Sequence, residues 1–165
     1  MARSASPPAV TLREASARSL AFNVLMSLRP GQWAKNLLVF AGLLFGLRLF
    51  DATAVGRAFA AFGIFCLLSG VVYLINDIAD RDTDRKHPHK ARRPIASGAL
   101  SVPGALRSAI VLGVVALAGA FALGPRFFMI AACYLALLAL YSGPLKHIVI
   151  IDVLTIAVGF VLRAV

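Results

Sequence analysis

Long apolar stretches alternate along the chain with shorter segments that carry most of the charges. Five such stretches cover about residues 33–50, 54–75, 104–123, 127–141 and 149–165. Each is long enough, or nearly so, to cross ~30 Å of hydrocarbon. They are rich in Leu, Ala, Val, Phe and Gly and lack the period-2 alternation of membrane β-strands. The pattern predicts five transmembrane helices, and therefore an all-α integral membrane protein with a multi-span helix bundle.

The composition supports a membrane location. The 165 residues are 60% hydrophobic with a mean hydropathy of +0.85, which exceeds what a soluble domain of this size can bury. Residues 1–18 are typical of a disordered tail. The stretch from Leu20 to Leu28 lacks a small-residue cleavage site after it, so we expect an interfacial helix and no signal peptide. Residues 19–165 are then the N-terminal part of a single transmembrane domain.

The net charge of +10 is unevenly distributed between the loops. If the N-terminus is inside, only Arg48, Arg57 and Arg126 fall on the outer side. Because short basic loops stay in the cytoplasm, the N-terminus and the polar loop 76–103 are expected there. The basic face can attract anionic headgroups or a phosphorylated substrate. Nucleic acid is the weaker explanation, since these residues lie between membrane spans.

Three carboxylates in the polar loop have a spacing that suggests metal binding. On a helix, Asp77, Asp80 and Asp84 fall within ~60° of one another, whereas Asp82 lies off that face. Clustered carboxylates repel unless a cation neutralises them, and hard oxygen ligands suit Mg²⁺. The same acids also fit a simpler interpretation, a solvated helix end paired with neighbouring Arg and Lys side chains. Spacing alone leaves both interpretations open.

A basic loop follows the carboxylates. It runs from Arg85 to Gly98 and includes Lys90, Arg92 and Arg93, whose side chains can donate several hydrogen bonds to phosphate oxygens. Positive-inside topology explains the sign of this charge but not the adjoining acidic face. The acidic cluster and the basic loop together indicate a site for a metal and a diphosphate.

Several separated motifs resemble one family. Asn76-Asp77-x-x-Asp80-x-x-x-Asp84 at the end of the second span is similar to the first aspartate-rich motif of the UbiA superfamily of intramembrane prenyltransferases. Leu28-Arg29-Pro30-Gly31-Gln32-Trp33-Ala34-Lys35-Asn36, the Lys86-His87-Pro88 to Gly98 stretch, and Tyr141-Ser142-Gly143-Pro144-Leu145-Lys146-His147 followed by Asp152 resemble its phosphoribosyl-transferring branch most. The resemblance covers about residues 28–165.

The resemblance implies a fold and an activity. It implies a bundle of about nine transmembrane helices in the bacterial cytoplasmic membrane, of which about five are present here. It further implies a polar cavity open to the cytoplasm, with Mg²⁺ bridging the donor diphosphate. In the phosphoribosyl branch, 5-phosphoribose passes from phosphoribosyl pyrophosphate to a polyprenyl (decaprenyl) phosphate, pyrophosphate is released, and the product supplies cell-wall arabinan precursors.

The resemblance and the basic loop together give a set of site residues. Asp77, Asp80 and Asp84 are expected to be catalytic and to hold the metal. The expected substrate-binding residues are Lys35, Asn36, Asn76, Arg81, Lys90, Arg92, Arg93, Tyr141, Lys146 and Asp152. From the residues alone, Lys35 and Lys146 could equally be snorkelling anchors at the membrane surface instead of substrate-binding residues, and Tyr141 could be an interfacial aromatic. Asp152 lies in an apolar stretch, where an ionisable group usually faces a cavity or a partner.

Two other functions remain open. One is prenyl transfer from a prenyl diphosphate to an aromatic acceptor or haem. The other is a non-catalytic membrane protein that binds anionic lipid or a partner through its basic face. The expected partners are polyprenyl phosphate, phosphoribosyl pyrophosphate or a prenyl diphosphate, and membrane lipids; a homo-oligomer is left open, and no nucleic acid is expected.

The end of the chain bears on the expected activity. The family carries a second aspartate-rich motif in the later half of its bundle, whereas this chain ends at Val165 in apolar sequence. We therefore expect a truncated protein with little or no transferase activity by itself.

Overall fold

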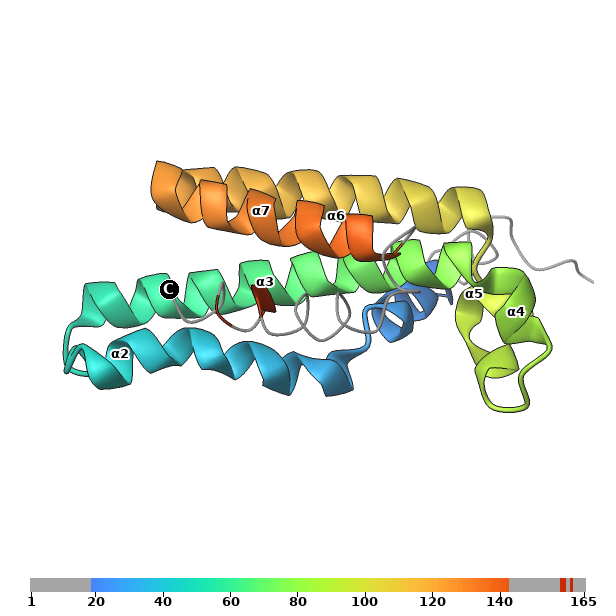
Figure 1. Ribbon diagram of the computed structural model, residues 1–165, viewed down its shortest axis with the longest axis horizontal. Coiled ribbons are helices and arrows are strands. Elements are labelled where there is room, and N and C mark those ends of the chain that lie inside the picture. The colour runs from blue at the N-terminus through green and yellow to red at the C-terminus, as the bar shows by residue number, and fades with distance from the viewer. Residues whose placement is uncertain (1–18, 143–157, 160, 162–165) are drawn as a thin grey trace, which may run out of the picture.

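The computed structural model describes residues 19–142, 158–159 and 161, and within these residues every regular element is a helix. Residues 19–27 form a first helical segment. The elements that follow are η1 (Pro30–Phe40, a 3-10 helix), α2 (Ala41–Phe45), α3 (Ala52–Ala79), α4 (Arg81–Arg85), η2 (Lys90–Arg92), α5 (Pro94–Ser97), α6 (Val102–Leu123) and α7 (Pro125–Ser142). In Figure 1, α3 runs between the pair α6 and α7 on one side and α2 with the preceding 3-10 helix on the other.

The central helix is α3, which packs against η1, α6 and α7. Its N-terminus is capped by Asp51, whose carboxylate accepts hydrogen bonds from the backbone N–H groups of Thr53 and Ala54 at 3.0 and 3.1 Å. The 28 residues of α3 extend ~42 Å, which is more than the ~30 Å thickness of the hydrocarbon layer. The polar C-terminal end of α3 therefore lies at or beyond one surface of the hydrocarbon.

A row of small residues brings α6 close to α3. The buried positions of α6 are all Ala or Gly: Ala105, Ala109, Gly113, Ala116 and Ala120. Small side chains let two membrane helices approach closely and pack by van der Waals contact. The other face of α6 exposes large apolar side chains such as Ile110 and Val114, which suits contact with lipid or with further helices.

The α7 helix completes the apolar core. It follows Gly124, which has a φ of +131° that L-residues rarely adopt. Tyr134 of α7 is fully buried and packs edge-to-face on Phe65 of α3, with ring centroids 5.1 Å apart. These rings join Leu68 and two small residues of α6, Ala116 and Ala120, in one of two buried clusters.

The structure confirms part of the predicted span pattern. Among the described residues, α3 and α6 are long and apolar enough to cross a membrane, and they coincide with the stretches predicted at 54–75 and 104–123. The stretch 127–141 coincides with α7, whose apolar part, Pro125–Ala139, is shorter. The stretch 149–165 lies outside the described residues except for 158, 159 and 161.

The stretch predicted as a helix over about 33–50 is helical, but the helix ends earlier than predicted. The chain forms η1 and then α2, which ends at Phe45, and it turns over residues 46–50. The turn is tight, because a Cβ added to Gly46 would lie 2.6 Å from the backbone oxygen of Gly42. Leu47 follows with a φ of +51°. A glycine that permits this close backbone approach therefore ends the helix before it reaches the predicted length.

A polar cap of short helices forms at the C-terminal end of α3. Figure 1 shows α4 and α5 gathered at this end of the molecule, near the first helical segment. The side-chain amide of Asn23 donates to the carbonyl of Ala99 at 3.1 Å, and Arg85 Nε donates to the carbonyl of Ala96 at 2.9 Å. Beneath the cap, Ile95 joins the second buried cluster. These contacts hold the polar loop against the end of α3.

Candidate functional site

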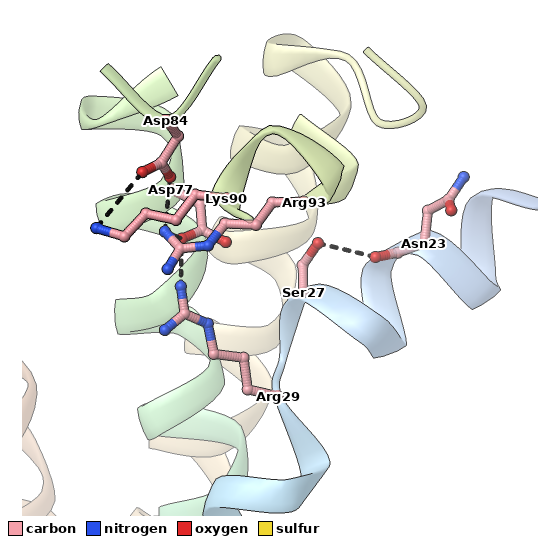
Figure 2. Close-up of polar contacts among 7 residues, drawn as sticks. All are labelled: Asn23, Ser27, Arg29, Asp77, Asp84, Lys90 and Arg93. Carbon is pink, nitrogen blue, oxygen red and sulfur yellow. Dashed lines mark hydrogen bonds and ion pairs between the residues drawn. The ribbon is translucent and has the colours of Figure 1, made fainter. Parts of the chain in front are cut away.

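Two buried carboxylates meet one guanidinium where the cap covers α3. The side chains of Asp77 in α3 and Asp84 in α4 are 3% and 2% exposed. Arg93 Nη1 donates to Asp77 Oδ1 at 3.1 Å and to Asp84 Oδ2 at 2.6 Å (Figure 2). One side chain from the basic loop thus bridges two acids that belong to different helices.

Two further cations surround the same carboxylates. Arg29 Nη2 donates to Asp77 Oδ1 at 2.5 Å, and its guanidinium lies 4.6 Å from the centroid of the Tyr73 ring. Lys90 Nζ lies 3.9 Å from Asp84 Oδ1. Burial of a carboxylate is costly unless the charge is paired and hydrogen-bonded. Here two carboxylates face three cations, so the cluster carries one surplus positive charge.

The backbone conformation at three positions directs the charged side chains of the cluster toward one another. Asp80, with φ −90° and ψ 4°, separates α3 from α4 and changes the chain direction between Asp77 and Asp84. Arg93 is extended, as the residue before a proline usually is, and precedes Pro94 at the start of α5. Arg29 lies in the left-handed region, with φ 52°, between the first helical segment and η1. Such a conformation is unfavourable for a non-glycine residue and persists where surrounding contacts hold it.

The break at Asp80 bears on the predicted metal site. Asp80 is half-buried at the junction between α3 and α4, whereas the other two carboxylates share Arg93. Within the described part of the chain, no three His, Cys, Asp or Glu side chains are grouped so that they could hold a metal ion. The joint metal role of Asp77, Asp80 and Asp84 therefore stays a prediction.

The donor chemistry nevertheless fits Mg²⁺. In phosphate-processing sites Mg²⁺ is commonly bound by one or two carboxylates, and waters and substrate phosphates complete its octahedral shell. Asp77 and Asp84 supply two carboxylates that already converge on one cationic group. They would hold a metal ion that arrives with a diphosphate.

The other predicted site residues are dispersed. Asn76 is half-buried beside Asp77, and Lys35 is exposed on η1. Arg92 is exposed on η2, and Arg81 lines a separate cavity of about 330 Å³ with Ile95, Leu100 and residues 101–103. Tyr141 lies in α7, but its side chain, together with Lys146 and Asp152, lies outside the described residues.

Asn36 is buried away from the acidic cluster. Its side-chain nitrogen donates to Ser69 Oγ at 3.3 Å and to Cys66 Sγ at 3.4 Å. Ser69 is eight residues before Asp77, or ~12 Å along α3. Asn36 Oδ1 is buried and has no hydrogen-bond partner among the described residues. The structure therefore places Asn36 beside the apolar part of α3 and does not join it to Asp77.

Arg29 is the functional candidate that the sequence analysis missed. It lies in the Leu28-Arg29-Pro30 segment that supports the family resemblance, and this was the only available signal. No periodic pattern connects it with Asp77, which is 48 residues away. The contact follows from the packing of the first helical segment against the end of α3, and packing of this kind is not encoded in local spacing.

Comparison with known proteins places the chain in a family. Residues 36–165 match the UbiA prenyltransferase family. The decaprenyl-phosphate phosphoribosyltransferase of Mycobacterium tuberculosis (strain ATCC 25618 / H37Rv) is 36% identical over 151 residues, which are 89% of this chain and 50% of that protein. The protein of the same name from Mycolicibacterium smegmatis is 35% identical over 152 residues, which are 90% of this chain and 48% of that protein. The chain thus spans about half the length of these curated relatives.

A solved structure agrees with the sequence relatives. A UbiA homolog from Archaeoglobus fulgidus, bound to GPP and Mg²⁺, superposes with a TM-score of 0.74 and is 27% identical in sequence. The match covers 86% of this chain and 51% of that one. Together with the two long apolar helices, these comparisons show that the chain is an integral membrane protein that belongs to the UbiA prenyltransferase family.

Proposed function

We propose that this chain supplies the donor-binding half of a transferase that moves 5-phosphoribose from phosphoribosyl pyrophosphate to a polyprenyl phosphate. The observation that carries the proposal is the buried pair of carboxylates, Asp77 and Asp84, with three cations around it. These cations, Arg29, Lys90 and Arg93, leave one surplus positive charge. The relatives named decaprenyl-phosphate phosphoribosyltransferase support this choice of donor and acceptor. The product would serve as a precursor of cell-wall arabinan.

The side chains of the cluster have distinct tasks in this proposal. Arg29, Lys90 and Arg93 donate hydrogen bonds to the donor's diphosphate oxygens, which carry growing negative charge as pyrophosphate leaves. Guanidinium groups suit this task because their planar donor set matches phosphate geometry. When bound by Asp77 and Asp84, with Asp80 nearby, Mg²⁺ would neutralise the leaving group as a Lewis acid.

Positioning accounts for the rest of the chemistry. The acceptor is itself a phosphate anion, so it needs no strong base to attack ribose C1. The cap, by burying both carboxylates almost completely, limits water near the reacting bond. Catalysis of this kind depends on charge stabilisation and on holding two anions at the right distance.

Donor binding is the first test. The chain is reconstituted in lipid nanodiscs, and binding of phosphoribosyl pyrophosphate is measured by calorimetry with and without Mg²⁺. We expect Mg²⁺-dependent binding that Asp77→Asn abolishes. Asp82→Asn is the matched control, because the Asp82 side chain is 86% exposed and forms a distant, 3.9 Å pair with Arg85. The proposal is contradicted if the affinity for phosphoribosyl pyrophosphate is the same with and without Mg²⁺, or if Asp77→Asn leaves that affinity unchanged.

A prenyl diphosphate is the second candidate donor. It is favoured by one observation, the GPP and Mg²⁺ bound to the Archaeoglobus fulgidus homolog. Both donors would present a diphosphate to the same cluster, so the two reactions are told apart by identifying the group that is transferred to the lipid. The protein is incubated with membranes and either ribose-labelled or prenyl-labelled donor. Label from ribose in the lipid product supports phosphoribosyl transfer, and label from the prenyl donor supports prenyl transfer.

A non-catalytic lipid-binding role makes the opposite prediction for the acids. In that case substitution of Asp77 or Asp80 leaves function intact, whereas changes to the Arg and Lys residues of the loop abolish it. For the enzyme, we further propose that the N-terminus and the loop 76–103 face the cytoplasm of a bacterial cell, where phosphoribosyl pyrophosphate would be available. The concentration of basic residues in these segments supports that orientation.

A further inference from the structure

We propose that the cavity between the first helical segment (residues 19–27) and the segment 89–99 binds a phosphate monoester carried on a long apolar chain. This inference rests on the proposed function and identifies where the lipid acceptor would place its headgroup. The cavity has a volume of about 420 Å³ and combines basic and apolar lining residues. That volume is within the range of small-molecule sites, ~300–1,000 Å³.

One side of the cavity is strongly basic. Arg29, Arg92 and Arg93 line it together with His89. Arg92 is exposed, and its side chain forms no ion pair or hydrogen bond with any residue in the described part of the chain. Arg29 and Arg93 each bond to carboxylate through one terminal nitrogen, which leaves further N–H groups of their five available. The cavity therefore offers several donors to a multiply charged phosphate.

The first helical segment contributes two large apolar side chains to the cavity, beside the polar Asn23 and Ser27. Phe22 and Met26 line the cavity and remain 61% and 51% exposed. Leu20 and Leu25 of the same segment are 48% and 45% exposed, so the segment presents an apolar surface at the polar end of the bundle. A free inorganic anion gains no binding energy from these apolar side chains. A phosphate on an isoprenoid chain gains binding energy both from the basic residues, through its phosphate, and from the apolar residues, through its chain.

The first helical segment is held in place by polar contacts. The Asn23 amide donates to the Ala99 carbonyl at 3.1 Å, and the Ser27 hydroxyl donates to the Asn23 carbonyl at 2.8 Å. Figure 2 shows Asn23 and Ser27 on the helix that leads toward Arg29. The cavity is thus bounded by two segments that are tied to each other, and it does not depend on a loose surface loop.

The position of the cavity suits a phosphate acceptor. Asp77 also lines it, and Arg29 and Arg93 connect it to the acidic cluster. A dianionic acceptor there would form a bond from its phosphate oxygen to ribose C1 while the bond from C1 to pyrophosphate breaks. Pyrophosphate keeps the electron pair, and no proton has to be transferred. The two arginines would then lie between the acceptor phosphate and the donor diphosphate and reduce their mutual repulsion.

The test measures acceptor binding without donor and without Mg²⁺. Farnesyl phosphate and inorganic phosphate are titrated separately into the chain in neutral-lipid nanodiscs. We expect farnesyl phosphate to bind more tightly than inorganic phosphate. Arg92→Gln should weaken the binding of farnesyl phosphate about tenfold. Phe22→Asn should weaken the binding of farnesyl phosphate several-fold and leave the binding of inorganic phosphate unchanged. Lys86→Gln and Leu25→Asn are the matched controls, because both residues are exposed and neither lines the cavity. Circular dichroism verifies that each variant keeps its helix content.

Other outcomes contradict the inference in identifiable ways. Equal affinity for farnesyl phosphate and inorganic phosphate, with no effect of Phe22→Asn, indicates a site for free phosphate. Displacement of farnesyl phosphate by phosphatidylglycerol at equal concentration indicates a general anionic-lipid site. Both results overturn the proposed acceptor site. If the chain binds farnesyl phosphate as expected but fails to bind phosphoribosyl pyrophosphate with Mg²⁺, the donor proposal fails and the cavity assignment stands.

Discussion

At the scale of single residues, the polar end of the molecule depends most on Arg93. Its guanidinium hydrogen-bonds to Asp77 and Asp84, which are nearly inaccessible to water and lie in α3 and α4. Its backbone leads directly into α5. Without Arg93, Asp77 would keep Arg29, and among the described residues Asp84 would keep only Lys90 at 3.9 Å. A buried charge that loses its partner destabilises the folded state strongly.

We predict that Arg93→Gln lowers the free energy of unfolding by about 3 kcal/mol. Lys86→Gln, an exposed position in the same loop, is expected to change it by less than about 0.5 kcal/mol. Equilibrium unfolding in mixed detergent micelles, followed by helix content, measures both. If the two variants are equally stable, the carboxylates are not held by Arg93 in the way the structure shows.

The coupling between Arg93 and Asp84 can be measured separately. Removing the guanidinium alone leaves the buried Asp84 carboxylate with the 3.9 Å contact to Lys90, whereas Arg93→Gln combined with Asp84→Asn removes both charges. We therefore expect the double variant to be more stable than the sum of the two single changes implies, by about 1–3 kcal/mol. A double-mutant cycle on the unfolding free energies gives this value. Additive effects would mean that the 2.6 Å contact between the two side chains contributes little.

The candidate site could be predicted from sequence only where its members are close in the chain. Asp77 and Asp84 are seven residues apart, and the basic loop follows them at once, so local spacing indicated a joint site. The contact from Arg29 required the tertiary fold. The junction at Asp80 was also unpredicted, because a continuous helical face was assumed across α3 and α4.

At the scale of elements, the packing of α6 on α3 depends on small side chains. Ala105, Ala109 and Gly113 recur at intervals of four residues and are buried on one face of α6. Ala109 is 4% exposed and belongs to the apolar cluster under the polar cap. Membrane helices gain little from the hydrophobic effect in lipid, so close van der Waals contact determines how well this pair associates.

A larger side chain at the centre of this face should separate the helices. We predict that Ala109→Leu destabilises the protein by about 1–3 kcal/mol, since overpacking a close interface forces backbone shifts. Val114→Leu is the matched control, because Val114 is 62% exposed on the same helix. Unfolding titrations with sodium dodecyl sulfate in bicelles compare the two variants. Equal stabilities would show that α6 tolerates a wider separation from α3.

The helices differ in how well sequence predicted them. Length and apolar composition were sufficient for α3 and α6, because each is a single uninterrupted run of residues. They placed the end of the stretch 33–50 too late, because the composition stays apolar through the turn after Phe45. The end of that helix depends on a close approach between the backbones of Gly42 and Gly46. A hydropathy pattern carries no information about such a contact.

At the scale of the whole molecule, charge differs between the two ends of α3. The polar cap, with α4 and α5, lies at one end in Figure 1, and α2 lies at the other. Arg48 and Arg57 belong to the α2 end, where Arg57 Nη2 donates to the carbonyl of Leu123 at 2.6 Å. That contact satisfies a carbonyl at the C-terminus of α6, so Arg57 has a structural task that does not require a cytoplasmic location.

The charge difference predicts an orientation that labelling can measure. Because short basic loops remain in the cytoplasm, the cap should face inward and the turn 46–50 outward. Cys66 and Cys133 are first replaced by Ala, and a single cysteine is then introduced as Arg48→Cys or Lys86→Cys. In intact cells, a membrane-impermeant maleimide should label the Arg48→Cys variant and reach the Lys86→Cys variant only after permeabilisation. The reverse pattern would place the acidic cluster outside, where a cytoplasmic phosphoribosyl donor has no access, and would exclude the proposed reaction.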